Sequence, residues 1–227
     1  MWFPVGTRTS GRRWLATLIA PAAAVIAVIA VPPASAHSGA TLFHGAWSAS
    51  TRAAVPIYAE SNISGAALSR ALAGAKAWDA LGESLDFTWK GTKNLSRDAC
   101  NGAVRGQNLI GLRPLDGRGK DLAMTTVCRS GGTIVRFVTV FDSAEDWYTG
   151  TSTTVPRGRP DLWSVAVHEF GHAAGWASHF DDPGIGLGAG LCGNFSGQHS
   201  MCATHYSGTA RQRSPGPHDI DTFRAMY

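Results

Sequence analysis

The sequence predicts an α+β domain, and two observations carry this prediction. Four stretches are rich in β-branched and aromatic residues, as strands are, and three others carry apolar residues at the spacing of an amphipathic helix. Apolar residues make up 44% of the 227 residues and charged residues only 16%, so the chain can bury a core and a wholly disordered chain is excluded.

Strands are expected at residues 55–58, 85–89, 108–112 and 133–141. Pro56 in the first of them suits an edge strand, because proline has no N–H to donate to a neighbouring strand. The last stretch is the longest and the richest in β-branched residues. These four strands would form the sheet of the domain.

Helices are expected over residues 64–81, over residues 161–175, and near the end of the chain. Gly82 follows the first helix, where a helix C-terminus favours glycine. Asp161 is a good N-cap for the second helix, which continues to Gly175. The final short helix has Asp219 or Asp221 near its start.

Residues 1–36 have the three parts of a secretory signal peptide. Three arginines and no acidic residue are combined with an apolar run over residues 14–31 and the small sequence Ala34-Ser35-Ala36. Cleavage after Ala36 would leave residues 37–227 as one secreted, extracellular domain without stable membrane association. The competing interpretation is an uncleaved membrane anchor, since the run is about long enough to span a bilayer. The Sec and twin-arginine export routes both stay open.

The net charge of +4 comes mostly from this leader. Of the 20 Lys and Arg residues three lie there, and the rest nearly balance the 16 Asp and Glu residues. No basic cluster remains that suits a phosphate backbone, so nucleic-acid binding is not expected. We expect a monomer.

The four cysteines all lie in the exported part of the chain, where an oxidising compartment favours disulfides. Pairing in sequence order closes two modest loops, Cys100 with Cys128 and Cys192 with Cys202. Structural disulfides are therefore predicted, and no C-x-x-C zinc site is present.

The second helix contains the sequence His168-Glu169-Phe170-Gly171-His172. Two histidines at i and i+4 project from one helical face and can bind one Zn²⁺, while Glu169 can reach a water on the metal. The alternative is that these are ordinary helix residues. The capped amphipathic helix around them favours the zinc site.

A catalytic zinc takes three protein ligands and a water. A glutamate cannot be the third ligand after this motif, because none of the four glutamates follows Glu169. The remaining candidates are His179 and, less favoured, Asp181, Asp182, His199, His205 and His218.

The stretch from His168 to His179 resembles the metzincin signature, in which HExxH is followed by a glycine and a third histidine. Gly175 stands at the signature position and would end the helix with a left-handed residue. The usual third-ligand position is Ser178, so a one-residue bulge must bring in His179; Asp181 is the next choice. The resemblance implies a zincin-like fold, with a twisted mixed sheet and an upper part (37–175) and lower part (176–227) on either side of the cleft.

Other features of the chain resemble matrixins of the secreted bacterial type, over most of residues 53–227. The resemblance implies that Met201 forms the Met-turn below the zinc histidines. It also implies that an extended protein or peptide substrate pairs with the edge of the strand at residues 133–141. For Tyr206 two roles stay open: it lines a substrate pocket or it fills the core. No histidine lies between His44 and His168, so a second zinc site ahead of the active-site helix is not expected, and we expect a single zinc. No cysteine-switch segment is expected either, because the first cysteine is Cys100. Calcium is possible but unsupported, with four candidates: Asp142, Asp146, Asp181 and Asp182.

These features predict a secreted zinc endopeptidase, in which Glu169 is the general base. The alternative is a non-catalytic secreted zinc-binding protein with a degenerate site. The shifted position of His179 is the feature that favours this alternative.

Overall fold

The computed structural model describes residues 43–94, 100, 106–180, 182, 192, 199–203 and 208–227. The strands are β1 (Ala46–Trp47), β2 (Val55–Ala59), β3 (Phe87–Thr92), β4 (Asn108–Arg113), β5 (Ala123–Ser130) and β6 (Thr133–Asp142). The helices in this part of the chain are α1 (Ala49–Arg52), α2 (Gly65–Asp79), α3 (Leu162–Ala174) and α5 (Pro217–Met226). The predicted signal peptide lies outside the described residues.

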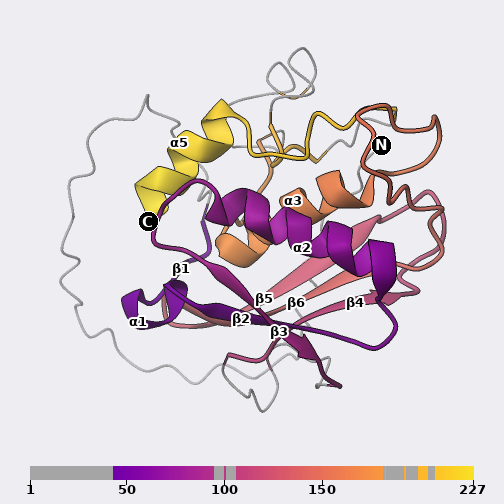
Figure 1. Ribbon diagram of the computed structural model, residues 1–227. Helices are drawn as coiled ribbons and strands as arrows, with labels where there is room; N and C mark the ends of the chain where they lie inside the picture. The colour runs from indigo at the N-terminus through magenta and orange to yellow at the C-terminus, as the bar shows by residue number, and fades with distance from the viewer. Residues whose placement is uncertain are drawn as a thin grey trace, which may run out of the picture.

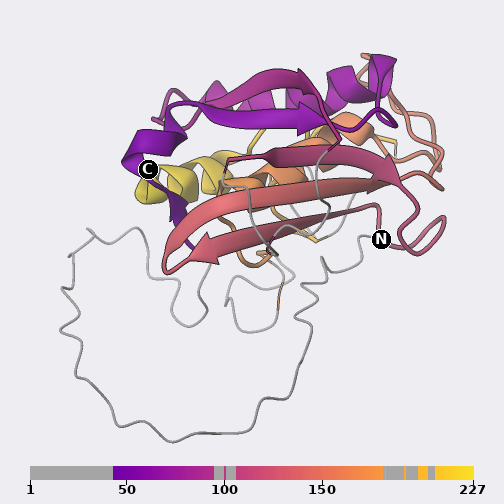
Figure 2. The ribbon, with the colours of Figure 1, turned by 90° about the horizontal axis from the view of Figure 1, so that it is seen from below.

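One mixed sheet organises the fold and confirms the predicted α+β class. Strands β1, β6, β4, β2 and β3 follow one another in parallel pairs, and β5 pairs antiparallel with β6. Helices α2 and α3 lie side by side on one face of this sheet, with α5 beyond α3 (Figures 1 and 2). This arrangement is compatible with the metzincin fold that the resemblance implies.

The prediction that Pro56 marks an edge strand is wrong. Strand β2 lies between β3 and β4 in the interior of the sheet. Pairing with β4 begins only at Ile57, which faces Asn108, so the missing N–H of Pro56 removes no hydrogen bond from that ladder. The side chain of Asn108 instead donates to the Pro56 carbonyl at 2.8 Å.

Strand β5 was not predicted, and it changes the position of β6. The two strands form a hairpin in which Ser130 faces Thr133 and Ala123 faces Phe141. Because β6 has β4 on one side and β5 on the other, it is internal, and among the described strands β5 and β3 lie at the two edges of the sheet. The inward positions of β5 include the small residues Ala123 and Thr125, so no strong hydrophobic alternation identifies the strand.

Helices α2 and α3 approach each other closely at Gly74. A Cβ at this position would lie 2.5 Å from the Ala166 Cβ. Near the same contact, the Trp78 indole donates to the Val167 carbonyl at 2.8 Å. Phe170 packs on the other side of α3 against Phe87 and Phe137 of the sheet, so α3 is held between α2 and the sheet.

The N-terminus of α3 begins as predicted at Asp161. Its carboxylate is fully buried and accepts from the Ser164 amide at 3.1 Å. Arg213 binds the same carboxylate through Nε and Nη2, each at 2.8 Å. This ion pair fixes the start of the helix to the segment that leads to α5.

The C-terminus of α3 is capped by residues that are distant in sequence. The carbonyl of residue 173 accepts from the Trp47 indole at 2.9 Å, and that of residue 174 accepts from the Tyr227 hydroxyl at 2.5 Å. The carbonyl of Gly175 accepts from the His44 amide at 2.9 Å. Gly175 has φ of 132°, and a Cβ there would lie 2.3 Å from the Gly45 carbonyl oxygen. Glycine is therefore required here by both backbone conformation and close packing.

Helix α5 has Asp219 in its first turn, as predicted, with Pro217 at its first position and Gly216 as N-cap. Proline supplies a favourable φ at this position, which the prediction overlooked. The disulfides join Cys100 to Cys128 and Cys192 to Cys202, the pairs expected from sequence order. Within the described residues, no helix is both long and apolar enough to cross a membrane.

Candidate metal centre

Three histidine side chains converge at the C-terminal part of α3. The Nε2 atoms of His168, His172 and His179 lie 3.2 to 3.3 Å from one another, and all three side chains are buried. In a tetrahedral zinc site with Zn–N bonds of about 2.0–2.1 Å, ligand nitrogens are about 3.3 Å apart. The spacing of the three nitrogens therefore fits one zinc ion.

The hydrogen bonds at the opposite ring nitrogens fix the tautomer of each histidine. His168 Nδ1 lies 2.7 Å from the Ser200 carbonyl oxygen, and His172 Nδ1 lies 3.0 Å from that of Trp176. His179 Nδ1 lies 3.2 Å from a carboxylate oxygen of Asp182. Carbonyls and ionised carboxylates only accept, so each Nδ1 carries the proton and each Nε2 presents a lone pair.

Three lone pairs within 3.3 Å repel one another unless a cation lies between them. Burial, with a smaller contribution from His179, lowers the pKa of His172 to about 3, so this ring is neutral at physiological pH. Neutral imidazoles with protonated Nδ1 atoms are the form that binds zinc. The residues present thus suit a metal, and zinc in particular.

Glu169 lies next to the first histidine and is fully buried. Neither of its carboxylate oxygens has a hydrogen-bond partner among the described residues. Burial raises the pKa of this carboxyl to about 8. A buried acid without a partner is costly for the fold, which is typical of a residue kept for function.

Met201 lies directly against α3 below the histidines. A Cβ on Gly171 would lie 2.2 Å from the Met201 sulfur, so the helix and the Met201 side chain are in close contact. The Asp219 carboxylate accepts from the amides of Ser200 at 2.6 Å, Met201 at 3.2 Å and Gly216 at 2.7 Å. It thereby holds the turn whose Ser200 carbonyl faces His168.

The other candidate ligands that the structure describes are not members of the histidine cluster. His199 and His218 face each other, with ring centroids 4.9 Å apart, and the metal-binding group in the described residues consists of the three buried histidines alone. Asp182 contacts His179 and is no member of that group. Asp181, His205 and Tyr206 lie outside the described residues.

Two of the proposed calcium ligands have protein partners. The Asp142 carboxylate accepts from the amides of Leu115, Gly117 and Ala144. Asp146 forms an ion pair with Arg159 at 3.0 Å. Both contacts account for these acids without a metal.

The substrate edge predicted from the sequence is also corrected. The strand at 133–141 is β6, whose two sides are occupied by β4 and β5, so it has no free edge along most of its length. Among the described strands, β5 has an unpaired edge on the side of the sheet that lies near α3, where the Thr125 hydroxyl donates to the Glu169 carbonyl at 3.3 Å. A strand that lies beside the metal centre with an open edge is the place where an extended peptide can add.

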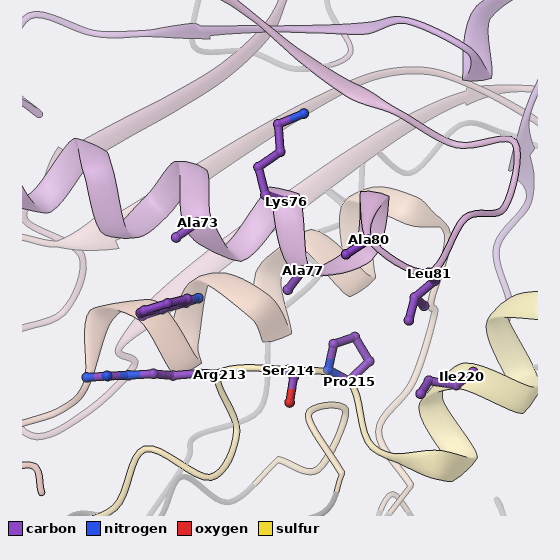
Figure 3. Close-up of a pocket in the computed structure, with 10 residues that line it drawn as sticks. Ala73, Lys76, Ala77, Ala80, Leu81, Arg213, Ser214, Pro215 and Ile220 are labelled. Carbon is purple, nitrogen blue, oxygen red and sulfur yellow. The ribbon is translucent and has the colours of Figure 1, made fainter. Parts of the chain in front are cut away.

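A separate hollow of about 440 Å³ lies between α2 and the segment leading into α5 (Figure 3). Its lining is mainly apolar and includes Ala77, Leu81, Pro215 and Ile220, and it contains none of the three histidines. It therefore offers no metal chemistry and is distinct from the metal centre.

A model of the matrixin family, Peptidase_M10, matches residues 67–185. The match covers more than half of the chain and includes most of α2, all of α3 and all three histidines, so the chain belongs to the matrixin family of metalloproteases. The resemblance inferred from the sequence is thereby confirmed. Among curated proteins, no significant match was found.

Two residues at this centre had no specific role in the sequence-based prediction. Asp219 was expected only as an acid at the start of the last helix, and Asp182 only as a candidate metal ligand. An acidic residue near a helix N-terminus is common, so the sequence carries no signal for the long-range contact of Asp219. The position of Asp182 three residues after His179 is the one signal available for its contact.

Proposed function

We propose that the chain is a secreted endopeptidase that uses one zinc ion, held by His168, His172 and His179. The observation that carries this proposal is the triangle of Nε2 atoms, each 3.2 to 3.3 Å from the others, with Glu169 adjacent in the helix. Zinc bound there would polarise a substrate carbonyl and lower the pKa of water. Secretion is supported by the two disulfides and by the signal-like sequence of residues 1–36.

Glu169 is proposed as the general base. Its carboxyl group has no partner in the described part of the chain, and a zinc ion held by the adjacent histidines would favour its ionised form. The carboxylate would then accept a proton from the attacking water and donate it to the leaving amine. Strand β5 holds the extended protein or peptide substrate by main-chain hydrogen bonds along its free edge. The substrate thus lies between this strand and the helix that carries Glu169.

The alternative, a non-catalytic zinc-binding protein, rested on the shifted position of His179. Its Nε2 nevertheless lies 3.2 Å from that of His168, so the extra residue does not displace the ring from the cluster. A site that only binds zinc also has no need for a buried, unpartnered carboxylate beside the first ligand. Both observations favour the enzyme.

The test compares casein cleavage and zinc content of the wild type, Glu169→Gln and His179→Ala. Glu83→Gln is the matched control, since Glu83 is partly exposed, pairs with Arg224 of α5 and is no member of the histidine cluster. Glu169→Gln should retain one zinc per chain and lose activity by about 10²- to 10⁴-fold, whereas His179→Ala should lose tight zinc binding. Cleavage at the wild-type rate by Glu169→Gln would refute the proposed base.

A further inference from the structure

The zinc-binding stretch of this chain has one more residue between Gly175 and its third histidine than the signature it resembles. The backbone is anchored on both sides of that histidine. Trp176 forms a bridge with Phe43, and the Phe180 amide donates to the Met201 carbonyl at 3.1 Å. The extra residue therefore has to be accommodated within a short segment, and the orientation of the His179 ring needs a support of its own.

Asp182 supplies three contacts at this point. The His179 amide donates to Asp182 Oδ2 at 2.7 Å, and the His179 ring Nδ1 lies 3.2 Å from Oδ1 of the same carboxylate. The Asp182 amide donates back to the His179 carbonyl at 3.2 Å. His179 and Asp182 are thus joined by both main chain and side chain, and one carboxylate holds the backbone and the ring of His179 together.

His179 differs in this respect from the other two histidines. The Nδ1 atoms of His168 and His172 face neutral backbone carbonyls, and only that of His179 faces a carboxylate. A carboxylate behind a metal-bound imidazole orients the ring, fixes the Nε2 lone pair toward the metal and makes the ring a stronger donor. The Asp182 side chain is 34% exposed, so the carboxylate keeps part of its hydration while it makes these bonds.

We propose that Asp182 is a positioning residue that compensates for the extra residue by holding His179 as a zinc ligand. This inference rests on the proposed zinc-binding function of the three histidines. Asp182 touches neither substrate nor metal in this role, and it acts only through the ring and backbone of His179.

The substitution Asp182→Asn separates this role from a general effect on folding. The amide and the ring of His179 bind different oxygens of Asp182, and an asparagine has an oxygen at only one of these two positions. If its oxygen faces the amide, its NH₂ group faces Nδ1 and favours the tautomer in which Nε2 carries the proton. That tautomer cannot bind zinc through Nε2.

The experiment measures zinc release from the purified full-length mature protein into a chromophoric chelator, for the wild type, Asp182→Asn and Asp221→Asn. Asp221 is an exposed residue of α5, so this control removes the same charge away from the centre. Melting of the metal-free proteins is measured in parallel. Asp182→Asn should bind zinc about 10- to 100-fold more weakly, with a metal-free melting temperature close to that of the wild type, and Asp221→Asn should match the wild type in both.

Zinc affinity of Asp182→Asn equal to that of the wild type would overturn the inference and leave the proposed function intact. A weaker zinc affinity would also overturn it if the free energy of unfolding of the metal-free Asp182→Asn protein fell by as much as its free energy of zinc binding. Asp182 would then be a structural residue. A wild-type protein that binds no zinc would instead refute the proposed function itself.

Discussion

Replacing Gly74 by alanine tests how closely the helix that carries the histidines is packed. Glycine inside a helix costs about 1 kcal/mol relative to alanine, so helix propensity alone predicts that Gly74→Ala stabilises the protein. The structure predicts the opposite sign. The new Cβ would lie 2.5 Å from the Ala166 Cβ, 2.6 Å from the Ala166 carbonyl carbon and 2.8 Å from the Val167 nitrogen.

The size of the effect follows from these distances. Carbon atoms in contact lie about 3.5 Å apart or more, so α2 and α3 would have to separate by about 1 Å. Two of the three atoms belong to the backbone of α3, which cannot rotate away. Overpacking of this kind costs about 1–3 kcal/mol, and subtracting the gain in propensity leaves a net loss of up to about 2 kcal/mol.

The assay is thermal melting of the metal-free protein followed by circular dichroism. For a chain of this size, 1 kcal/mol corresponds to about 2–4 °C, so we expect the melting temperature of Gly74→Ala to fall by several degrees. Ala73→Gly, at the neighbouring and partly exposed position of α2, should lower it by the ordinary helix-propensity cost. A melting temperature of Gly74→Ala above that of the wild type would refute the close approach of the two helices.

Three further predictions concern residues of α3, its N-cap and α2. Gly171→Ala places a Cβ 2.2 Å from the sulfur of Met201, the flexible end of a side chain, so it should cost less stability than Gly74→Ala but speed zinc release to a chelator; unchanged release would contradict it. Asp161→Asn keeps an acceptor for the helix N-cap but breaks the buried ion pair with Arg213, and should cost about 3–5 kcal/mol in denaturant unfolding. With Arg213→Met added, the total loss should be smaller than the sum of the single losses, and strict additivity would exclude coupling. Burial raises the pKa of Asp79 from 3.8 to about 6, so the wild type loses stability as the pH rises from about 4 to 6. The stability of Asp79→Asn relative to the wild type should therefore increase over that range, and a constant difference would exclude the shift.

The parts of the fold that the sequence predicts well are those determined by local pattern. Helix α3 combines an N-cap, an apolar stripe and a terminal glycine within 15 residues, and its ends agree with the prediction at Asp161 and Gly175. The zinc motif lies inside this helix, so its geometry follows from helical spacing. The choice of His179 agrees with its place in the cluster, and it came from the position of this histidine shortly after Gly175, as in the signature that the stretch resembles.

The features that escaped prediction depend on contacts between distant segments. Strand β5 has small inward residues and is defined by its pairing with β6, so its sequence shows no clear period. The error for Pro56 has the same origin, since the position of β2 in the sheet depends on where its pairing with β4 begins. Asp219 looks like an ordinary residue of a helix start until its partners at Ser200 and Met201 are known.

The three capped carbonyls at the end of α3 have a consequence for protein engineering. The groups that cap them come from residues 44, 47 and 227. Each donor therefore lies 53 or more residues away from its acceptor in the sequence. A peptide or grafted loop that contains only residues 162–179 would lack these donors as well as the Ser200 carbonyl. The zinc-binding stretch is therefore not a portable module, and a transplant into another scaffold would have to reproduce the ends of this domain along with the motif.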